Sequence, residues 1–514
     1  MASTAVPDVQ SSLNAPRRTD LAALAVALLC VAASRWIAVS VFEELPHLED
    51  EFANLWQAEV MADGRIALAS PPEPQSFLVP FVVDHDGVRF GKYPPGWPAL
   101  LAVGAFVGFP AWVNPLLAGV AVWLTYRLGS RLAGGWGGVL AALLVATSPM
   151  ILMLSGNLMP HMLTIVLTLA FSLAWFDLFV PRGGAPLGPG MTGRRLLVAL
   201  AGLSFGLLAI TRPLTALAVA LPFGVHALTL LIRRRPGVGR ELLGLGAGAI
   251  FVILLLPLWQ WALTGDPWVN PYTLFWPNDR IGFGPGIGVL EGGHTLRQAW
   301  INTRHSLWAW QHDLFGWPFV SWIFVPVGLW AARKRPEGWI AVGAFVSLAV
   351  CYLAYWVGSW LLGPRYFVEA VPGLAVVSAA GLLWAGGWLG TEVRAGRARR
   401  LAMAALLAIL LGVNLFGYLP GRVGGLYGLF GITRQALESF EAVHPGRALV
   451  IVRRNPYWHG YGNLLTLTAP FVESDLLLAY ERGPEVDPEV VALFPGLPAY
   501  VYDPAEPGML RAAR

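Results

Sequence analysis

The chain has 514 residues, of which 56% are hydrophobic and only 13% are charged, and its mean hydropathy is +0.58. This composition excludes an ordinary soluble domain and indicates a membrane protein with many spans. The net charge of +4 comes from arginines that lie between apolar runs. It therefore reflects membrane topology, and no nucleic-acid partner is predicted.

The first apolar run, at 20–42, follows Arg17 and Arg18, and residues 1–19 are predicted to form a cytoplasmic tail. Because many apolar runs follow, the first is interpreted as an uncleaved signal anchor. The two cysteines, Cys30 and Cys351, each lie inside an apolar run. This placement predicts no structural disulfide.

About eleven apolar runs are long enough to cross a bilayer, which takes roughly 20 helical residues. They lie at 20–42, 111–131, 136–156, 158–180, 195–211, 213–232, 241–264, 317–332, 338–362, 366–390 and 400–419. A further run at 97–109 would reach only about 20 Å as a helix, against a hydrocarbon core of about 30 Å. It is predicted to be an interfacial or re-entrant helix.

If the run at 97–109 does not cross the membrane, the clusters of basic residues all fall on one side. They are Arg17/Arg18, Arg127/Arg131, Arg182/Arg194/Arg195, Arg233 to Arg235, Arg333 to Arg335 and Arg394 to Arg400. The positive-inside rule identifies this side as the cytoplasm. The loops 43–110 and 265–316, and the chain after about 420, then share the extracytoplasmic face.

The predicted fold class is an all-α polytopic membrane protein with a large first extracytoplasmic loop. Its transmembrane domain covers residues 20–420. From 434 to 514, helix-like and strand-like stretches such as RQALESFEA, ALVIVRR and DLLLAY alternate. They predict a small α/β domain outside the membrane.

Chemistry is most strongly indicated between His47 and Pro98, a dense polar segment in a mostly apolar chain. Asp50 and Glu51 begin a short helical pattern there, and both are candidate catalytic groups. A base that takes a proton from a hydroxyl must lie between water and a pocket, as these carboxylates do. The alternative is that they only complement the positive N-terminus of the helix.

Several cations are predicted on the outer face, where the positive-inside rule expects few. The chain has 35 basic residues, yet only Lys92 and Lys334 are lysines. Lys92, Arg212, Arg280 and Arg365 all lie at or near the outer surface. Together they suggest a phosphate-bearing ligand at headgroup depth; the alternative is that each reaches lipid headgroups from an apolar surface.

Histidines give weaker indications. His161 follows Met159-Pro160 at the outer end of a span, where a histidine more often caps or packs. His47 and His85 lie beside acidic residues, but their spacing matches no strong metal motif. No metal site is predicted; one formed by Asp50 and His161 is the alternative.

Five stretches carry a resemblance to a known family. They are EDEFANLWQAEVMADGR, KYPPGWPALL, SPMILMLSGNLMPH, GLLAITRPLTAL and GPRYFVEAVPGL. They resemble the C-type glycosyltransferases (GT-C), in particular the branch with the protein O-mannosyltransferases and the bacterial lipid A aminoarabinose transferase. The resemblance implies transfer of a sugar, with inversion, from a polyprenyl-phosphate carrier to an acceptor outside the cytoplasm.

The resemblance also implies roles for single residues. Asp50 matches an acidic residue proposed as the base or the acceptor-positioning group, and Lys92 matches a position that contacts the donor phosphate. Arg365 and Tyr366 match an Arg-Tyr element at the outer end of a late span. Many members carry a second acidic residue in the next external loop, where this chain has 157–161, NLMPH. A metal site that bridges two loops is therefore less expected.

The sequence thus predicts an inverting glycosyltransferase of a bacterial cell membrane. Asp50 is the expected base with Glu51 as support, and Lys92 and Arg365 are expected on the donor phosphate. Further candidates for the phosphate are Tyr366, Arg212 and Arg280, and other candidates in the pocket are His161 and His47. No cofactor is predicted beyond the polyprenyl-phosphate-linked sugar. The partners expected are this donor, membrane lipids and an envelope acceptor that is a lipid, glycan or protein.

Two other functions remain open at this stage. A transporter or flippase of a lipid-linked saccharide is one, although it should place ionisable groups near the middle of the membrane within broken helices. The other is a non-catalytic assembly factor whose tail binds glycan through Tyr457, Trp458, His459 and Tyr461.

Overall fold

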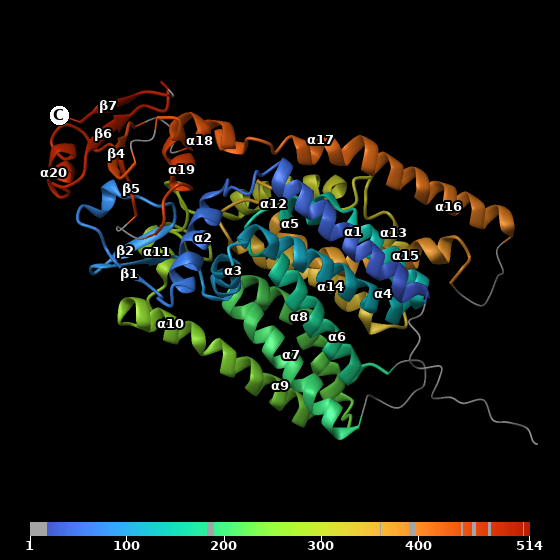
Figure 1. The fold of residues 1–514 in the computed structure, drawn as a ribbon. Helices are drawn as coiled ribbons and strands as arrows, with labels where there is room; N and C mark the ends of the chain where they lie inside the picture. Colours follow the sequence, from blue (N-terminus) through green and yellow to red (C-terminus); the bar gives the residue numbers. More distant parts are fainter. Residues whose placement is uncertain are drawn as a thin grey trace, which may run out of the picture.

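The fold is seen in a computed structural model that describes residues 18–181, 190–359, 361–389, 396–443, 446–454, 459–470, 474–506 and 508–513 (Figure 1). Within these ranges, nine helical segments are long and apolar enough to cross a membrane. They are Arg18–Ser40, Pro110–Ala146, His161–Phe179, Met191–Thr211, Pro213–Ile232, Val238–Thr264, Pro336–Ala354, Arg365–Ala385 and Arg397–Gly424. The predicted helical membrane fold is confirmed, and the number of eleven spans stays a prediction.

Two predicted runs account for the difference in number: 317–332, where the helix Phe324–Ala331 has only eight residues, and one of the two runs that make up α4 (Val113–Ala146). Helix α4 reverses direction at Gly134, where φ is +76°. A Cβ on Gly138 would lie 2.5 Å from the carbonyl oxygen of Tyr126, although a straight helix would separate these residues by about 18 Å. The two limbs are therefore antiparallel. They coincide with the stretches 111–131 and 136–156, and the second limb leads into α5 (Pro149–Ser155).

This close approach makes a testable prediction about Gly138. We expect Gly138→Val to destabilise the protein by about 1–3 kcal/mol, because the added side chain meets backbone of the other limb. Thermal unfolding in detergent, followed by tryptophan fluorescence, measures the effect. Gly246→Val is the control, since nothing lies within 4 Å of a Cβ at Gly246; equal melting temperatures for the two variants would refute the tight hairpin.

The remaining helices complete the bundle around α4. They are α1 (Arg18–Ser40), α6 (His161–Phe179), α7 (Met191–Thr211), α8 (Pro213–Ile232), α9 (Val238–Ile253), α10 (Leu255–Thr264), α13 (Phe324–Ala331), α14 (Pro336–Cys351), α15 (Val371–Ala385), α16 (Arg397–Gly412) and α17 (Leu419–Gly424). Helix α15 is almost wholly buried against α4 and α13, where small residues permit close packing. Helix α16 lies at the edge of the bundle with most of its apolar surface exposed (Figure 1).

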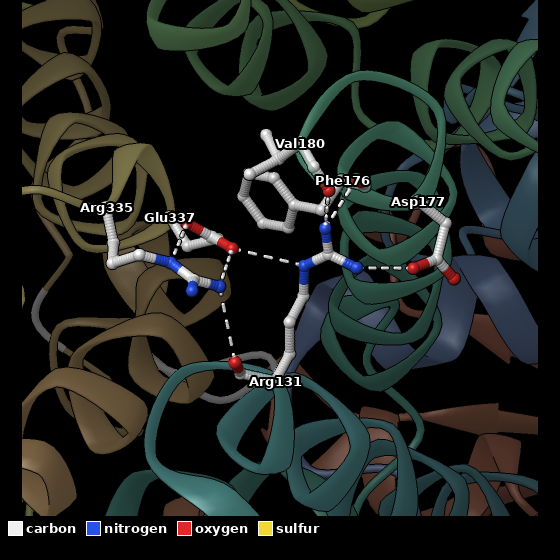
Figure 2. A network of polar contacts seen from close by, with 6 residues as sticks. All are labelled: Arg131, Phe176, Asp177, Val180, Arg335 and Glu337. Atoms are coloured by element: carbon white, nitrogen blue, oxygen red, sulfur yellow. Dashed lines mark hydrogen bonds and ion pairs between the residues drawn. The ribbon is translucent and has the colours of Figure 1, made fainter. Parts of the chain in front are cut away.

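Basic residues from several loops gather at one end of the bundle, where Arg131 is buried (Figure 2). Arg131 donates to the Phe176 carbonyl oxygen at 2.6 Å and pairs with Glu337 at 3.1 Å, as well as with Asp177. Arg335 donates to Glu337 at 2.9 Å. Arg194 and Arg235 also donate to carbonyl oxygens at the end of α6. These clusters share one end, and its identification as cytoplasmic stays a prediction.

The segment predicted to be the first outer loop contains α2 (Glu49–Ala62). A three-stranded antiparallel sheet follows, in the order β1 (Leu68–Ala69), β3 (Val88–Gly91), β2 (Val82–His85). The predicted hairpin about Asp86-Gly87 is present, with positive φ at both turn residues. Next comes α3 (Gly96–Phe106), which would span only about 16 Å. As predicted for 97–109, this helix is too short to cross.

Short elements lie in the segments between the longer helices and strands. They are η2 (Pro74–Ser76), η3 (Pro110–Trp112), α11 (Pro271–Phe275), η4 (Tyr352–Ala354) and η5 (Arg365–Ala370). The longer α12 (Leu296–Asp313) begins at Thr295, whose hydroxyl accepts from the Gln298 backbone N–H. Its far end is fixed by Asp313, which binds Arg422 at 2.9 Å.

The tail forms the predicted α/β domain. A π-helical turn η6 (Val413–Tyr418), α17 and η7 (Leu429–Gly431) lead to α18 (Arg434–Glu441), β4 (Ala448–Val452), α19 (His459–Leu465), β5 (Leu476–Tyr480), α20 (Asp487–Ala492), β6 (Ala499–Tyr502) and β7 (Leu510–Ala512). The sheet order is β5-β4-β6-β7, and only β7 is antiparallel. Tyr457 and Trp458 lie outside the described residues. Tyr461 is buried, and its hydroxyl donates to the Leu478 carbonyl oxygen, so it is not placed to stack on a glycan.

The α/β domain packs directly against α2 (Figure 1). Leu45 and Phe52 belong to the same hydrophobic cluster as Leu437 and Phe440 of the tail. The Glu43 carboxylate also accepts from the Arg434 backbone N–H at 2.7 Å. The tail therefore supports the helix that begins with the acidic residues.

Candidate active site

A cavity of about 1040 Å³ lies between α2, the loop at Lys92, the segment 265–316 and the end of α14. It is at the opposite end of the bundle from the arginine cluster, because α6 begins at the cavity with His161 and ends beside Arg131. Most of the predicted site residues line this cavity: Asp50, Lys92, His161, Arg212, Arg280, Arg365 and Tyr366. Folding thus brings together residues more than 300 positions apart in the chain.

Asp50 lies at the first turn of α2 and is about one quarter exposed. Its Oδ1 accepts a hydrogen bond from the Tyr93 hydroxyl at 2.6 Å, and its Oδ2 lies 3.6 Å from Nη2 of Arg365. Burial, together with the negative charge of Asp50, raises the pKa of Tyr93 well above its usual value. Tyr93 therefore keeps its proton and orients the carboxylate.

Glu51 has a different position from its neighbour. It is fully buried, does not line the cavity, and accepts backbone hydrogen bonds from Leu158 at 3.0 Å and Leu48 at 3.3 Å. Its carboxylate connects α2 to the loop before α6. Glu51 thus lies behind Asp50 and away from the cavity, and its role as a support stays a prediction.

His47 also lies outside the cavity. It is buried, its Nδ1 is 2.9 Å from the Leu45 carbonyl oxygen, and its ring meets Phe42 edge to face. Arg280 lines the cavity on an exposed stretch of the loop 265–316. Of the two, only Arg280 is placed to meet a ligand.

Burial raises the pKa of Glu51 from 4.5 to about 7, which predicts a pH dependence of stability. Between these values the folded protein binds more protons than the unfolded chain, so its stability falls as the pH rises. Glu51 should therefore make the melting temperature decrease from pH 4.5 to 8, against the opposite contribution of His47, whose pKa is lowered by burial. In Glu51→Gln this decrease should become smaller; an identical slope in both proteins would contradict the assignment.

Lys92 is almost completely enclosed. Its Nζ lies 3.4 Å from Oδ2 of Asp279, and both side chains are at most 3% exposed. The ammonium group also faces a set of aromatic rings at 3.5–5.5 Å from their centroids, namely Phe81, Trp276, Tyr272, Tyr93 and Phe275. Burial lowers the pKa of Lys92, and the charge of Asp279 opposes this shift.

Arg212 lies between α7 and α8 and is held on two sides. Nη1 donates to Oε1 of Glu369 at 2.5 Å, and Nη2 donates to the Tyr352 hydroxyl at 2.9 Å. Tyr352 stacks on Tyr366, with ring centroids 4.7 Å apart. The guanidinium groups of Arg212 and Arg365 both lie within 6 Å of the Tyr366 ring centroid. Both cations therefore lie near the same tyrosine ring at the cavity wall.

Arg365 has unused hydrogen-bonding capacity. It is buried, and its Nε and Nη1 have no hydrogen-bond partner among the described residues. Both ring nitrogens of the buried His161 also lack a hydrogen-bond partner among the described residues. Buried polar groups are normally satisfied by protein, water or ligand. Because Arg365 and His161 both line the cavity, an anionic ligand would fit here.

Sequence reasoning did not find four residues that contact the predicted ones: Tyr93, Asp279, Tyr352 and Glu369. Tyr93 and Asp279 had a detectable signal, since each adjoins a selected cation, Lys92 or Arg280. Glu369 gave none beyond its place in the stretch GPRYFVEAVPGL. Within the described ranges, no group of three or more His, Cys, Asp or Glu side chains is placed to hold a metal ion, so the alternative site of Asp50 and His161 gains no further ligand.

No protein-family model matches the sequence, and no curated protein matches it. Solved structures do match. ArnT from Cupriavidus metallidurans bound to undecaprenyl phosphate shares 15% identity and a TM-score of 0.58, with 94% of this chain and 92% of that chain covered. Its apo state gives a TM-score of 0.54 over the same shares, also at 15% identity.

A weaker match is the oligosaccharyltransferase AglB from Archaeoglobus fulgidus in complex with an inhibitory peptide and a dolichol-phosphate. It has 14% identity and a TM-score of 0.47, with 94% of this chain and 69% of that chain covered. The match to ArnT over nearly the whole length confirms the GT-C fold predicted from the sequence.

Proposed function

We propose that this protein is an inverting membrane glycosyltransferase that uses a polyprenyl-phosphate-linked sugar and acts at the extracytoplasmic face. The observation that carries the proposal is the arrangement around Asp50. A carboxylate held by Tyr93 faces a cavity in which a buried arginine, Arg365, has two nitrogens without partners among the residues that the structure describes. The solved structure of ArnT with undecaprenyl phosphate, which has the same fold, supports a lipid phosphate as the ligand.

In this reaction the acceptor hydroxyl attacks C1 of the sugar, and the bond from C1 to the phosphate oxygen breaks. Asp50 takes the proton of the hydroxyl as the new bond forms. The lipid phosphate leaves with the electron pair of the broken bond and needs charge neutralisation rather than a proton. One base with a group of cations therefore suffices, without the two opposed carboxylates of a glycosidase.

The phosphate is assigned chiefly to Arg365, because its Nε and Nη1 groups, which have no partner in the described part of the chain, can form charge-assisted hydrogen bonds. Arg212 and His161 lie next to it, and the charges of both arginines act on His161. Lys92 contributes positive charge from the first outer loop, and its salt bridge with Asp279 of the loop 265–316 holds it in place. Tyr366, whose ring centroid lies within 6 Å of both guanidinium groups, helps to keep the two arginine side chains in place.

Mass spectrometry of cell-envelope glycans from cells with and without the gene tests the proposal and identifies the sugar. We expect one sugar modification to be missing without the gene and restored by the wild-type protein. Unchanged glycans would count against an enzyme of this kind.

A transporter or flippase is distinguished by the reaction in detergent, where there are no compartments. The purified protein is mixed with undecaprenyl-phosphate-linked sugars and an envelope extract. A transferase releases undecaprenyl phosphate, which chromatography with mass detection measures, whereas a transporter leaves the carrier intact. The gathering of ionisable groups at one end of the bundle favours the enzyme.

A role of the tail in binding glycan cannot be tested by deleting the tail alone. Deletion from residue 434 onward would uncover Leu45 and Phe52, which pack against the tail. Loss of activity after such a deletion would therefore reflect a displaced α2 as well as any lost binding. Point substitutions in the cavity are the cleaner test.

A further inference from the structure

Asp279 connects three segments of the chain at the cavity wall. It lies in the loop 265–316, and its side chain is only 1% exposed. Oδ2 faces the Lys92 ammonium group of the first outer loop at 3.4 Å, and Oδ1 accepts from the Trp356 indole N–H at 3.0 Å. Both carboxylate oxygens are therefore engaged with segments that are distant in sequence.

The surroundings of Lys92 explain why this carboxylate matters. The negative groups that act on Lys92 are Asp279, Asp50 and Glu49, and only Asp279 forms a salt bridge with it. The other near neighbours are aromatic rings, including those of Tyr93 and Tyr272, whose hydroxyls stay protonated because burial raises their pKa. Rings attract an ammonium ion but do not replace the water that burial removes.

We propose that Asp279 is the positioning residue for Lys92: it holds the ammonium group in its charged form at the cavity wall and fastens the loop 265–316 to the first outer loop. The use of that charge for a donor phosphate rests on the proposed function. The pairing itself does not, because it follows from the contacts of Asp279 alone.

Asp279→Asn separates charge from packing. The amide has nearly the same shape, and its oxygen can still accept from Trp356. It replaces Oδ2, the charged acceptor that faces Lys92, with a neutral NH2 group that cannot accept from the ammonium group. Asp279→Glu is the companion variant, because it keeps the charge on a longer side chain.

The chain offers an internal reference, since Lys92 and Lys334 are its only lysines and Lys334 is exposed. The full-length protein in detergent is labelled with trace acetic anhydride at a series of pH values. Mass spectrometry then gives the labelling of each lysine, scaled to its own plateau. In the wild type we expect a lower midpoint for Lys92 than for Lys334.

In Asp279→Asn we expect the Lys92 midpoint to fall by about one further pH unit or more, roughly a tenfold change in proton affinity. The Lys334 midpoint should not move. An unchanged Lys92 midpoint, with only a changed plateau, would show a purely structural role and overturn the proposal. If Asp279→Asn is not recovered folded, Asp279→Glu decides: its Lys92 midpoint should stay near that of the wild type, and a fall of a full unit overturns the proposal.

The labelling needs no sugar donor, so its result is independent of the proposed function. If the midpoint falls in Asp279→Asn but the wild type transfers no sugar, the pairing stands and the proposed function fails. If transfer does occur, its alkaline limit should move to lower pH in Asp279→Asn, in step with the Lys92 midpoint.

Discussion

Replacement of Asp50 by Asn should lower sugar transfer by about 10²–10⁴-fold, the usual contribution of a general base. The amide keeps the size of the side chain and an acceptor for the Tyr93 hydroxyl, which lies 2.6 Å from Oδ1. It cannot take the proton of an acceptor hydroxyl. Release of undecaprenyl phosphate from a panel of its sugar conjugates, in the presence of an envelope extract, measures the loss.

The matched control is Glu59→Gln on the same helix. Glu59 is half-buried and does not line the cavity, so this change should leave transfer close to that of the wild type. If Asp50→Asn retains near wild-type turnover while its melting temperature is normal, Asp50 is not the base. A fall of equal size in both variants would instead indicate a general disturbance of α2.

Replacement of Arg365 by Lys should weaken binding of undecaprenyl phosphate by about 10- to 100-fold, as expected when one or two charge-assisted hydrogen bonds are lost. Lysine keeps the charge but cannot reproduce the planar fork of N–H groups. In Arg365, Nε and Nη1 are the groups that stand ready for a ligand. The readout is the rise in melting temperature with added undecaprenyl phosphate, which depends on affinity for the folded state.

Arg304→Lys is the control for this variant, because Arg304 is exposed on α12 and does not line the cavity. It should show the same lipid-dependent rise as the wild type. Equal rises in Arg365→Lys and the wild type would remove Arg365 from the phosphate site. Because the probe carries no sugar, the result does not depend on which sugar is transferred.

The pattern of apolar and basic residues was sufficient to predict the membrane fold. Spans depend on local hydrophobicity, so they can be predicted without knowledge of packing. The side on which each loop lies, inferred from its arginines, stays a prediction. Helix α4 shows a feature that the pattern of apolar and basic residues does not predict. Its two apolar runs were separable in the sequence, yet the sharp reversal at Gly134 depends on a positive φ and on the close approach of the two limbs.

For the site, the sequence by itself determined which residues were unusual. Asp50, Lys92 and Arg365 are ionisable residues that lie close to the predicted outer ends of apolar runs. Only the tertiary structure decided what they meet. Asp50 and Glu51 are consecutive, but neighbouring residues on a helix point about 100° apart, and packing turned Asp50 to the cavity and Glu51 to the loop before α6. The partners of the cations, Asp279 and Glu369, come from distant segments. Such pairs form because burial requires each charge to find a counter-charge, and which one lies within reach is fixed by how the helices and outer loops pack together.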